Sequence, residues 1–223
     1  MESNHSPKQT SFFKELLIFG IAIAPIFYLL SIWESLPQQI PIHWNIKGEV
    51  DGYSDKSSLW WVILAMNAPI YLLLLFLPKL SAKQKNIQLM GKKYYRLRLI
   101  LQLFLSALVF AILLASSGNS SASIETLLGY CFVFFMLSFG NYMGSIRQNH
   151  FMGIRTPWTL ENEEVWKKTH QLGGRLWIGS AIIGLVLLLI LPSNWILIII
   201  VALMTIPMFA AAIYSFILFK KIT

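Results

Sequence analysis

Long apolar runs dominate this chain, and short polar segments separate them. Each run has about the 20 residues that a helix needs to cross a bilayer. The pattern predicts six membrane-spanning helices, at residues 16–36, 59–77, 97–115, 124–146, 176–191 and 195–219. The last two runs are separated only by Pro192-Ser193-Asn194, so we expect them to form an antiparallel helical hairpin.

Composition supports an all-α integral membrane protein that forms one domain over residues 1–223. The chain is 56% hydrophobic and 13% charged, whereas a soluble domain carries about a quarter charged residues. Its one cysteine, Cys131, lies in an apolar run and is expected to be a small buried residue. A single thiol excludes an intramolecular disulfide and a thiolate metal cluster.

Lysine and arginine positions predict the orientation. If there are six spans, one side of the membrane holds all of the 18 basic residues except Lys47 and Lys56. By the positive-inside rule, both termini then lie in the cytoplasm of a plasma-membrane protein. The predicted segments outside the spans are a cytoplasmic N-terminus (1–15), an extracellular loop (37–58), a basic cytoplasmic loop (78–97) and a second cytoplasmic loop (147–175).

The net charge of +8 lies in these loops beside the spans. Anionic membrane lipids therefore explain it better than nucleic acid does. We expect contact with membrane lipids and no direct nucleic-acid binding.

The outer loop, residues 40–56, is rich in turn-forming residues. Apolar residues alternate at positions 40, 42 and 44, which suggests a short extended piece, and Asp51-Gly52 favours a tight turn with positive φ. The pattern predicts a small hairpin that caps the helices, with Trp44 and Tyr53 as membrane anchors.

The inner loop carries helix signals in its second half. Thr159 predicts an N-cap, and Gly173-Gly174 predict a stop or a bend. Between them, acidic residues precede basic ones and apolar residues share one face. We therefore predict an amphipathic helix lying at the cytoplasmic interface.

Polar residues inside the predicted spans are few. Asn67, Gln102 and Asn141 are uncharged, and such groups need partners and often face the interior of a helix bundle. No acidic residue lies deep in a predicted span.

Neither loop matches a known catalytic or metal site. The inner loop holds His150, His170 and three glutamates but no HExxH motif, GxSxG elbow or phosphate-binding glycine loop. The acidic residues and His43 of the outer loop match no standard metal spacing. We expect no enzyme activity, no metal and no cofactor.

The inner loop reads GNYMGSIRQNHFMGIRTPWTLENEEVWKKTH over residues 140–170. This run closely resembles the signature of the SdpI-type immunity proteins of Gram-positive bacteria. The matching positions are Asn141, Asn149, Gly153, Ile154, Arg155, Thr156, Pro157, Trp158, Thr159, Leu160, Glu163, Val165, Trp166 and Lys167. The outer loop resembles the companion domain of uncharacterised function that precedes this signature in longer members.

The resemblance implies immunity and signal transduction. The member after which the family is named protects its producer from a secreted peptide toxin and, with toxin present, holds a small autorepressor at the membrane, whereas the function of many relatives is open. The implied partners are a secreted antimicrobial peptide toxin and a cytoplasmic transcriptional repressor.

Two sets of residues follow as candidate sites. The toxin-facing set in the outer loop is His43, Trp44, Asn45, Gly48, Asp51 and Tyr53. The signature set is Asn141, Asn149, Gly153, Arg155, Thr156, Pro157, Trp158, Thr159, Glu163 and Trp166. The signature residues either bind a partner or lock the loop to the neighbouring spans, and the sequence favours neither role.

Two other classes of function remain as alternatives. A small-molecule or ion transporter, or a channel-like protein, would be favoured by an intramembrane charge or an internal repeat, and the pattern shows neither. A membrane enzyme acting at the cytoplasmic face would lose activity, without loss of protein, when one acid or histidine of the inner loop is changed.

Overall fold

The computed structural model describes residues 12–45, 50–118 and 123–222. Its elements are α1 (Phe12–Ile32), the 3-10 helix η1 (Trp33–Ser35), β1 (Gln39–Trp44), β2 (Val50–Asp55), α2 (Ser58–Leu80), α3 (Gln84–Met90), α4 (Lys92–Ser116), α5 (Ile124–Met143), α6 (Pro157–Glu161), α7 (Glu163–Ile190) and α8 (Ser193–Ile222). Six of these helices, namely α1, α2, α4, α5, α7 and α8, are long and apolar enough to cross a membrane. The prediction of a six-span helical membrane protein is confirmed.

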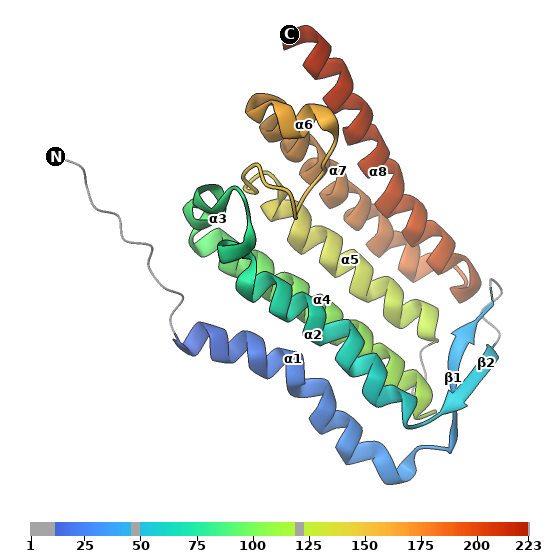
Figure 1. Ribbon diagram of the computed structural model, residues 1–223. Helices are drawn as coiled ribbons and strands as arrows, with labels where there is room; N and C mark the ends of the chain where they lie inside the picture. Colours follow the sequence, from blue (N-terminus) through green and yellow to red (C-terminus); the bar gives the residue numbers. More distant parts are fainter. Residues whose placement is uncertain (1–11, 46–49, 119–122, 223) are drawn as a thin grey trace.

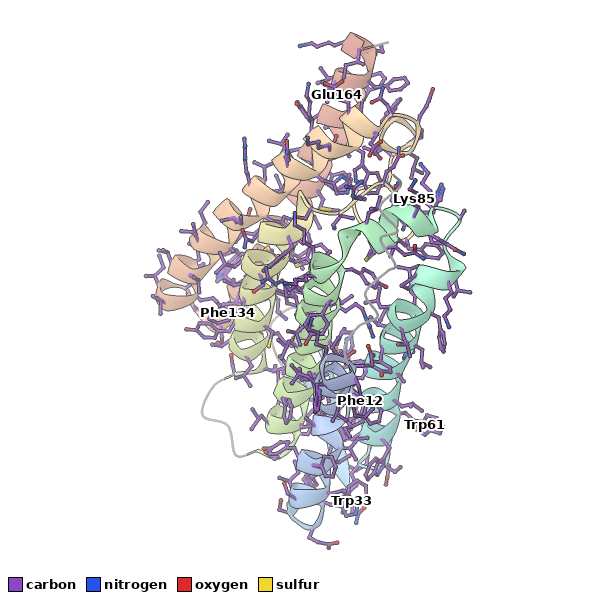
Figure 2. All side chains as sticks on the ribbon, turned by 90° about the vertical axis from the view of Figure 1, so that its left-hand side faces the viewer. Phe12, Trp33, Trp61, Lys85, Phe134 and Glu164 are labelled. Carbon is purple, nitrogen blue, oxygen red and sulfur yellow. The ribbon has the colours of Figure 1, made fainter. Side chains whose placement is uncertain are left out.

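The long helices lie side by side, and the short elements gather at the two ends of the bundle (Figure 1). The β-hairpin lies where α2 and α8 begin, and we call this the hairpin end. The short helices α3 and α6 lie at the opposite end, which we call the signature end. Figure 2 shows Trp33 and Trp61 at the hairpin end and Lys85 and Glu164 at the signature end.

Strands β1 and β2 form the predicted hairpin, which is antiparallel. Ile40 is fully buried against the ends of α1, α2 and α4. The expected Asp51-Gly52 turn is wrong, because both residues lie within β2 and Gly52 pairs with His43. Glycine is needed there for space, since a Cβ on Gly52 would lie 2.9 Å from the His43 Cβ.

The link from β2 to α2 is a short capped turn. The Ser57 N–H donates to the Asp55 carboxylate over 2.8 Å. This contact stabilises the ionised form and lowers the pKa of Asp55.

The loop predicted at residues 147–175 is largely helical, which corrects the sequence interpretation. Thr156, not Thr159, caps the five-residue α6, and Asn162 caps a new helix. That helix, α7, runs through Gly173-Gly174 without a break. The amphipathic stretch is therefore the first part of the fifth span, not a separate helix at the interface.

The segment between α2 and α4 is also more ordered than a basic loop. α2 continues to Leu80, α3 follows, and α4 begins at Lys92. Ile87 and Met90 of α3 are buried in the main hydrophobic cluster, which packs this segment against the bundle.

The buried hydrophobic residues of the described part of the chain form two main clusters. The larger one joins α5, α7 and α8 to α3 and to parts of α2 and α4, with Met136 and Trp166 among its most buried members. The smaller one lies at the hairpin end and includes Leu29, Ile40 and Leu113. The hairpin thus packs on α1, α2 and α4 rather than on the C-terminal helices.

The polar residues of the spans follow the prediction in part. Asn67 and Gln102 are buried, and the Gln102 amide donates to the Asn67 oxygen over 2.6 Å. Ser106 donates to the same oxygen over 2.9 Å. Asn141, however, is exposed on the surface of α5 instead of facing the interior.

Arg98 and Glu15 form an ion pair that the sequence pattern did not predict. Arg98 lies inside α4, where it is 4% exposed. Its guanidinium donates to both carboxylate oxygens of Glu15, in the first turn of α1, over 2.7 and 2.8 Å. The pair ties the start of α1 to the start of α4, because a bidentate contact of this kind is strong and directional.

Candidate functional site

The signature segment, residues 144–170, closes the signature end between α5 and α7. Asn149 organises its first half. The Asn149 side-chain oxygen Oδ1 accepts hydrogen bonds from the N–H groups of Phe151 and Met152, each over 2.8 Å. The side-chain amide of Asn149 donates to the Arg147 carbonyl over 2.8 Å. Asn149 is fully buried, so its side chain supplies the hydrogen bonds that this irregular backbone lacks.

His170 holds the centre of the segment. Its Nδ1 donates to the Trp166 carbonyl over 2.8 Å, and its Nε2 accepts the Ile154 N–H over 2.9 Å. The imidazole also stacks on the Trp166 ring, with centroids 4.1 Å apart. Since Nε2 accepts and Nδ1 donates, the ring is neutral, and both nitrogens are used in holding the loop.

Gly153 is the residue that lets the loop approach His170. Its φ is +103°, which L side chains rarely adopt, and a Cβ there would lie 2.1 Å from His170 Nε2. Glycine is required for both reasons. Ile154 follows directly and donates the hydrogen bond to the imidazole.

Thr156, Pro157 and Thr159 form a helix start. Thr156 accepts the Thr159 N–H, and the Thr159 hydroxyl accepts the Thr156 N–H, which is a reciprocal capping box with Pro157 in the first turn. Glu163 lies in the first turn of α7 after the Asn162 cap, where its charge favours the helix N-terminus. The signature therefore encodes two successive helix starts.

Three further signature contacts dock the segment. The Trp158 ring packs on Phe216 of α8 with centroids 4.8 Å apart, and the Thr156 and Ser215 hydroxyls are hydrogen-bonded over 2.9 Å. The buried Trp166 indole donates to the Ile146 carbonyl over 2.7 Å. These contacts join α6 and its cap to α8, and α7 to the turn that follows α5.

Arg155 differs from its neighbours because it is exposed. Its guanidinium donates to the carbonyl of the exposed His150 over 2.5 Å. Glu163, Glu164 and Lys167 are exposed nearby along the start of α7. A charged outer surface thus covers a buried polar interior.

Gln148 is a structural residue that the sequence analysis missed. Its buried amide donates to the Thr159 and Leu160 carbonyls over 2.8 Å, and its oxygen accepts from Lys83. The Asn86 amide donates to the Gln148 carbonyl over 2.9 Å. Gln148 therefore joins the signature segment to the connection between α2 and α4, which no local sequence signal reveals.

The toxin-facing set lies at the other end of the molecule. His43 and Asp51 are both exposed and interact over 2.5 Å, and Tyr53 is 62% exposed. Asn45 directly follows β1. Gly48 lies outside the described residues, and the Trp44 side chain is likewise not described.

A metal centre is not evident in the residues that the structure describes. No group of three or more His, Cys, Asp or Glu side chains comes together there. The His43–Asp51 pair supplies only two such ligands.

The signature segment and the hairpin each lie in a part of the chain that matches a known protein family. Residues 145–215 match the SdpI/YfhL protein family, and residues 20–66 match a domain of unknown function, DUF1648. The chain is 27% identical over 207 residues to the Immunity protein SdpI of Bacillus subtilis (strain 168). The aligned length covers 92% of this chain and 96% of the relative. No solved structure gives a significant match. The C-terminal half of the chain thus matches the SdpI/YfhL family, DUF1648 lies ahead of that match, and the similarity to the immunity protein extends over nearly the whole chain.

Proposed function

We propose that this chain is a membrane immunity protein that protects its cell from a secreted antimicrobial peptide toxin. The observation that carries the proposal is the similarity to the Bacillus subtilis immunity protein along nearly the whole of both chains. The hairpin end faces the outside and the signature end faces the cytoplasm. The concentration of lysine and arginine at the signature end supports this orientation.

The hairpin is the proposed toxin-sensing element. His43, Asp51 and Tyr53 are exposed, whereas Ile40 anchors the hairpin in the smaller hydrophobic cluster. A hairpin whose strand β1 is anchored by Ile40 and which exposes polar and aromatic side chains suits recognition of a peptide.

α2 offers a physical route between the two ends. It begins directly after the hairpin and ends at the connection whose Lys83 and Asn86 contact Gln148. A displacement of the hairpin would move α2, and through Gln148 would reach the signature segment. In the proposed mechanism this movement alters the exposed surface around Arg155, where a cytoplasmic autorepressor binds.

Survival under toxin challenge tests the immunity proposal. The gene would be expressed in a Bacillus subtilis strain that lacks its own SdpI, and the cells would be exposed to the secreted toxin. We expect the native chain to restore survival and the His43→Ala/Tyr53→Ala variant to lose most of it at equal membrane abundance. Death of cells that carry the native chain in the membrane would contradict immunity to this toxin.

The signature surface needs a separate test. We expect Arg155→Ala/Trp158→Ala to release the repressor from the membrane fraction. The matched control is Arg175→Ala/Trp195→Ala, which removes an exposed arginine and an exposed tryptophan outside the signature and should leave the repressor bound. Equal recovery of the repressor from membranes with the native chain, the variant and the control would contradict the proposed partner surface. The immunity proposal, which survival tests, would still stand.

A further inference from the structure

A groove runs along the outer surface of the bundle between α4 and α5. Its part nearest the signature end has a volume of about 560 Å³ and is lined by residues of α4, α5 and α7, among them Arg96, Asn141 and Tyr142. A second part of about 340 Å³ continues toward the hairpin end and shares Ile100 and Ser138 with the first. The two parts therefore form one continuous groove.

The two parts of the groove differ in chemistry. At the signature end, Arg96 is exposed and donates to the Tyr142 hydroxyl over 3.1 Å, and the Asn141 amide makes no hydrogen bond to any described residue. Farther along, the lining is apolar and includes Leu103, Phe104 and Phe134. One end of the groove offers hydrogen-bond donors and the other offers a hydrocarbon-like trough. Figure 2 shows Phe134 on the outer side of α5.

The charged side chains at the polar end of the groove are all positive among the described residues. Among the described residues no carboxylate pairs with Arg96 and none lines the groove. Lys92 and Lys93 are exposed one turn before Arg96 on the same helix. A phosphate would find cationic partners here, whereas the ammonium group of a zwitterionic lipid would find no counter-charge.

The length of the groove matches one leaflet of a membrane. From Arg96 to Ala107 it follows α4 over twelve residues, whose eleven steps span about 16 Å at the helical rise. Half of the hydrocarbon core of a bilayer is about 15 Å. We propose that this groove is a binding site for an anionic phospholipid, with the phosphate at Arg96 and Asn141 and one acyl chain in the trough. The site is independent of toxin immunity.

Lipid retention by the purified full chain tests the proposal. Native mass spectrometry would compare phosphatidylglycerol with phosphatidylcholine of the same chains. We expect preferential retention of phosphatidylglycerol, reduced on the order of tenfold by Arg96→Gln, since a charge-assisted contact is lost. Lys167→Gln removes an exposed charge elsewhere and should leave retention unchanged. Equal retention of both lipids, or equal loss in both variants, would overturn the proposal.

The apolar half needs its own variant. Ser138→Phe fills the point that the two parts share, and we expect it to lower retention several-fold with Arg96 intact. Thr205→Phe, at an exposed position of α8, is the matched control. Cys131 lines the trough and is the chain's one cysteine, so phosphatidylglycerol should also slow its alkylation by an apolar maleimide. Unchanged alkylation would overturn the proposal. A chain that retains no lipid but forms a dimer, which Ser138→Phe disperses, would also overturn it and would assign the groove to another copy of the chain.

Discussion

The N-terminal helices and the C-terminal helices are held together by different means. In residues 12–116, which we call the polar-paired region, Glu15 binds Arg98 and Asn67 binds Gln102. In residues 123–222, which we call the close-packed region, glycines bring helices into direct contact. A Cβ on Gly174 would lie 2.5 Å from the Gly140 carbonyl oxygen, whereas a Cβ on Gly20 of α1 would meet nothing within 4 Å.

The difference reflects what a membrane allows. Lipid tails are as apolar as leucine, so burial of apolar surface between spans supplies little driving force. Helices then associate through polar contacts or through small residues that permit close packing. A polar pair can be replaced as a unit by two apolar residues, but a steric fit cannot be restored in that way. The close-packed region should therefore tolerate fewer changes, and four predictions test this.

Gly153→Ala should have the largest effect. The added methyl would collide with His170 Nε2 and the residue would have to hold a φ of +103°. We expect a loss of about 4 kcal/mol in the free energy of unfolding, the sum of backbone strain and overpacking. Unfolding of the purified chain in a titration with sodium dodecyl sulfate, followed by circular dichroism, measures it.

Gly118→Ala separates the two causes. Gly118 also has positive φ, +66°, but a Cβ there would meet nothing within 4 Å. It should lose about 1 kcal/mol, the cost of the backbone conformation alone. If Gly153→Ala cost no more than this control, the close approach to His170 would not limit stability.

Glu15→Gln should rank second, in the polar-paired region. It leaves the guanidinium of Arg98 inside the bundle without its counter-charge, and we expect a loss of about 3 kcal/mol. The double variant Glu15→Gln/Arg98→Met should recover most of that loss, because the unpaired charge is gone. Glu34→Gln, at an exposed acid of η1, should change stability by less than about 0.5 kcal/mol. A double variant no more stable than Glu15→Gln would show that this pair cannot be replaced as a unit.

Gly174→Ala should rank third. Because its new Cβ would meet backbone, α5 and α7 would have to move apart, at a cost of about 2 kcal/mol. Gly179→Ala on the same helix has open space around it and should be neutral or stabilising by up to about 1 kcal/mol. Equal effects of the two substitutions on detergent-induced unfolding would remove the distinction between the regions.

Sequence alone predicted the features that depend on local pattern. The six spans follow from apolar length, and the hairpin follows from alternation, although its turn was placed wrongly at Asp51-Gly52. Gly173-Gly174 misled the prediction because glycine weakens an isolated helix, whereas here both residues are buried where α7 packs on its neighbours. Helix packing, which the local pattern does not contain, reversed the preference.

The candidate site was predictable as a set of residues but not as an arrangement. Asn149, Gly153 and Thr156 stand in the signature, yet the hydrogen bonds of His170 and Gln148 depend on residues that are 16 and 65 positions away. The ion pair of Arg98 was not predicted either, because its partner Glu15 lies 83 positions earlier. Distant pairings of this kind follow from the fold, and one sequence does not specify them.

The smallest effect should come from the Asn67–Gln102 pair. The Asn67 oxygen accepts from both Gln102 and Ser106, so loss of one donor leaves the other in place. A double-mutant cycle of Asn67→Leu and Gln102→Leu should give a coupling energy of about 0.6 kcal/mol, the usual value for hydrogen bonds between membrane helices. In a Ser106→Ala background the coupling energy should rise, because the Asn67 oxygen then loses its second donor and depends on Gln102. A coupling of zero would mean that this pair adds nothing to the hold of α2 on α4, where the Tyr94 hydroxyl also donates to the Leu74 carbonyl over 2.5 Å. Of the two pairs compared, only Glu15–Arg98 would then stabilise the polar-paired region.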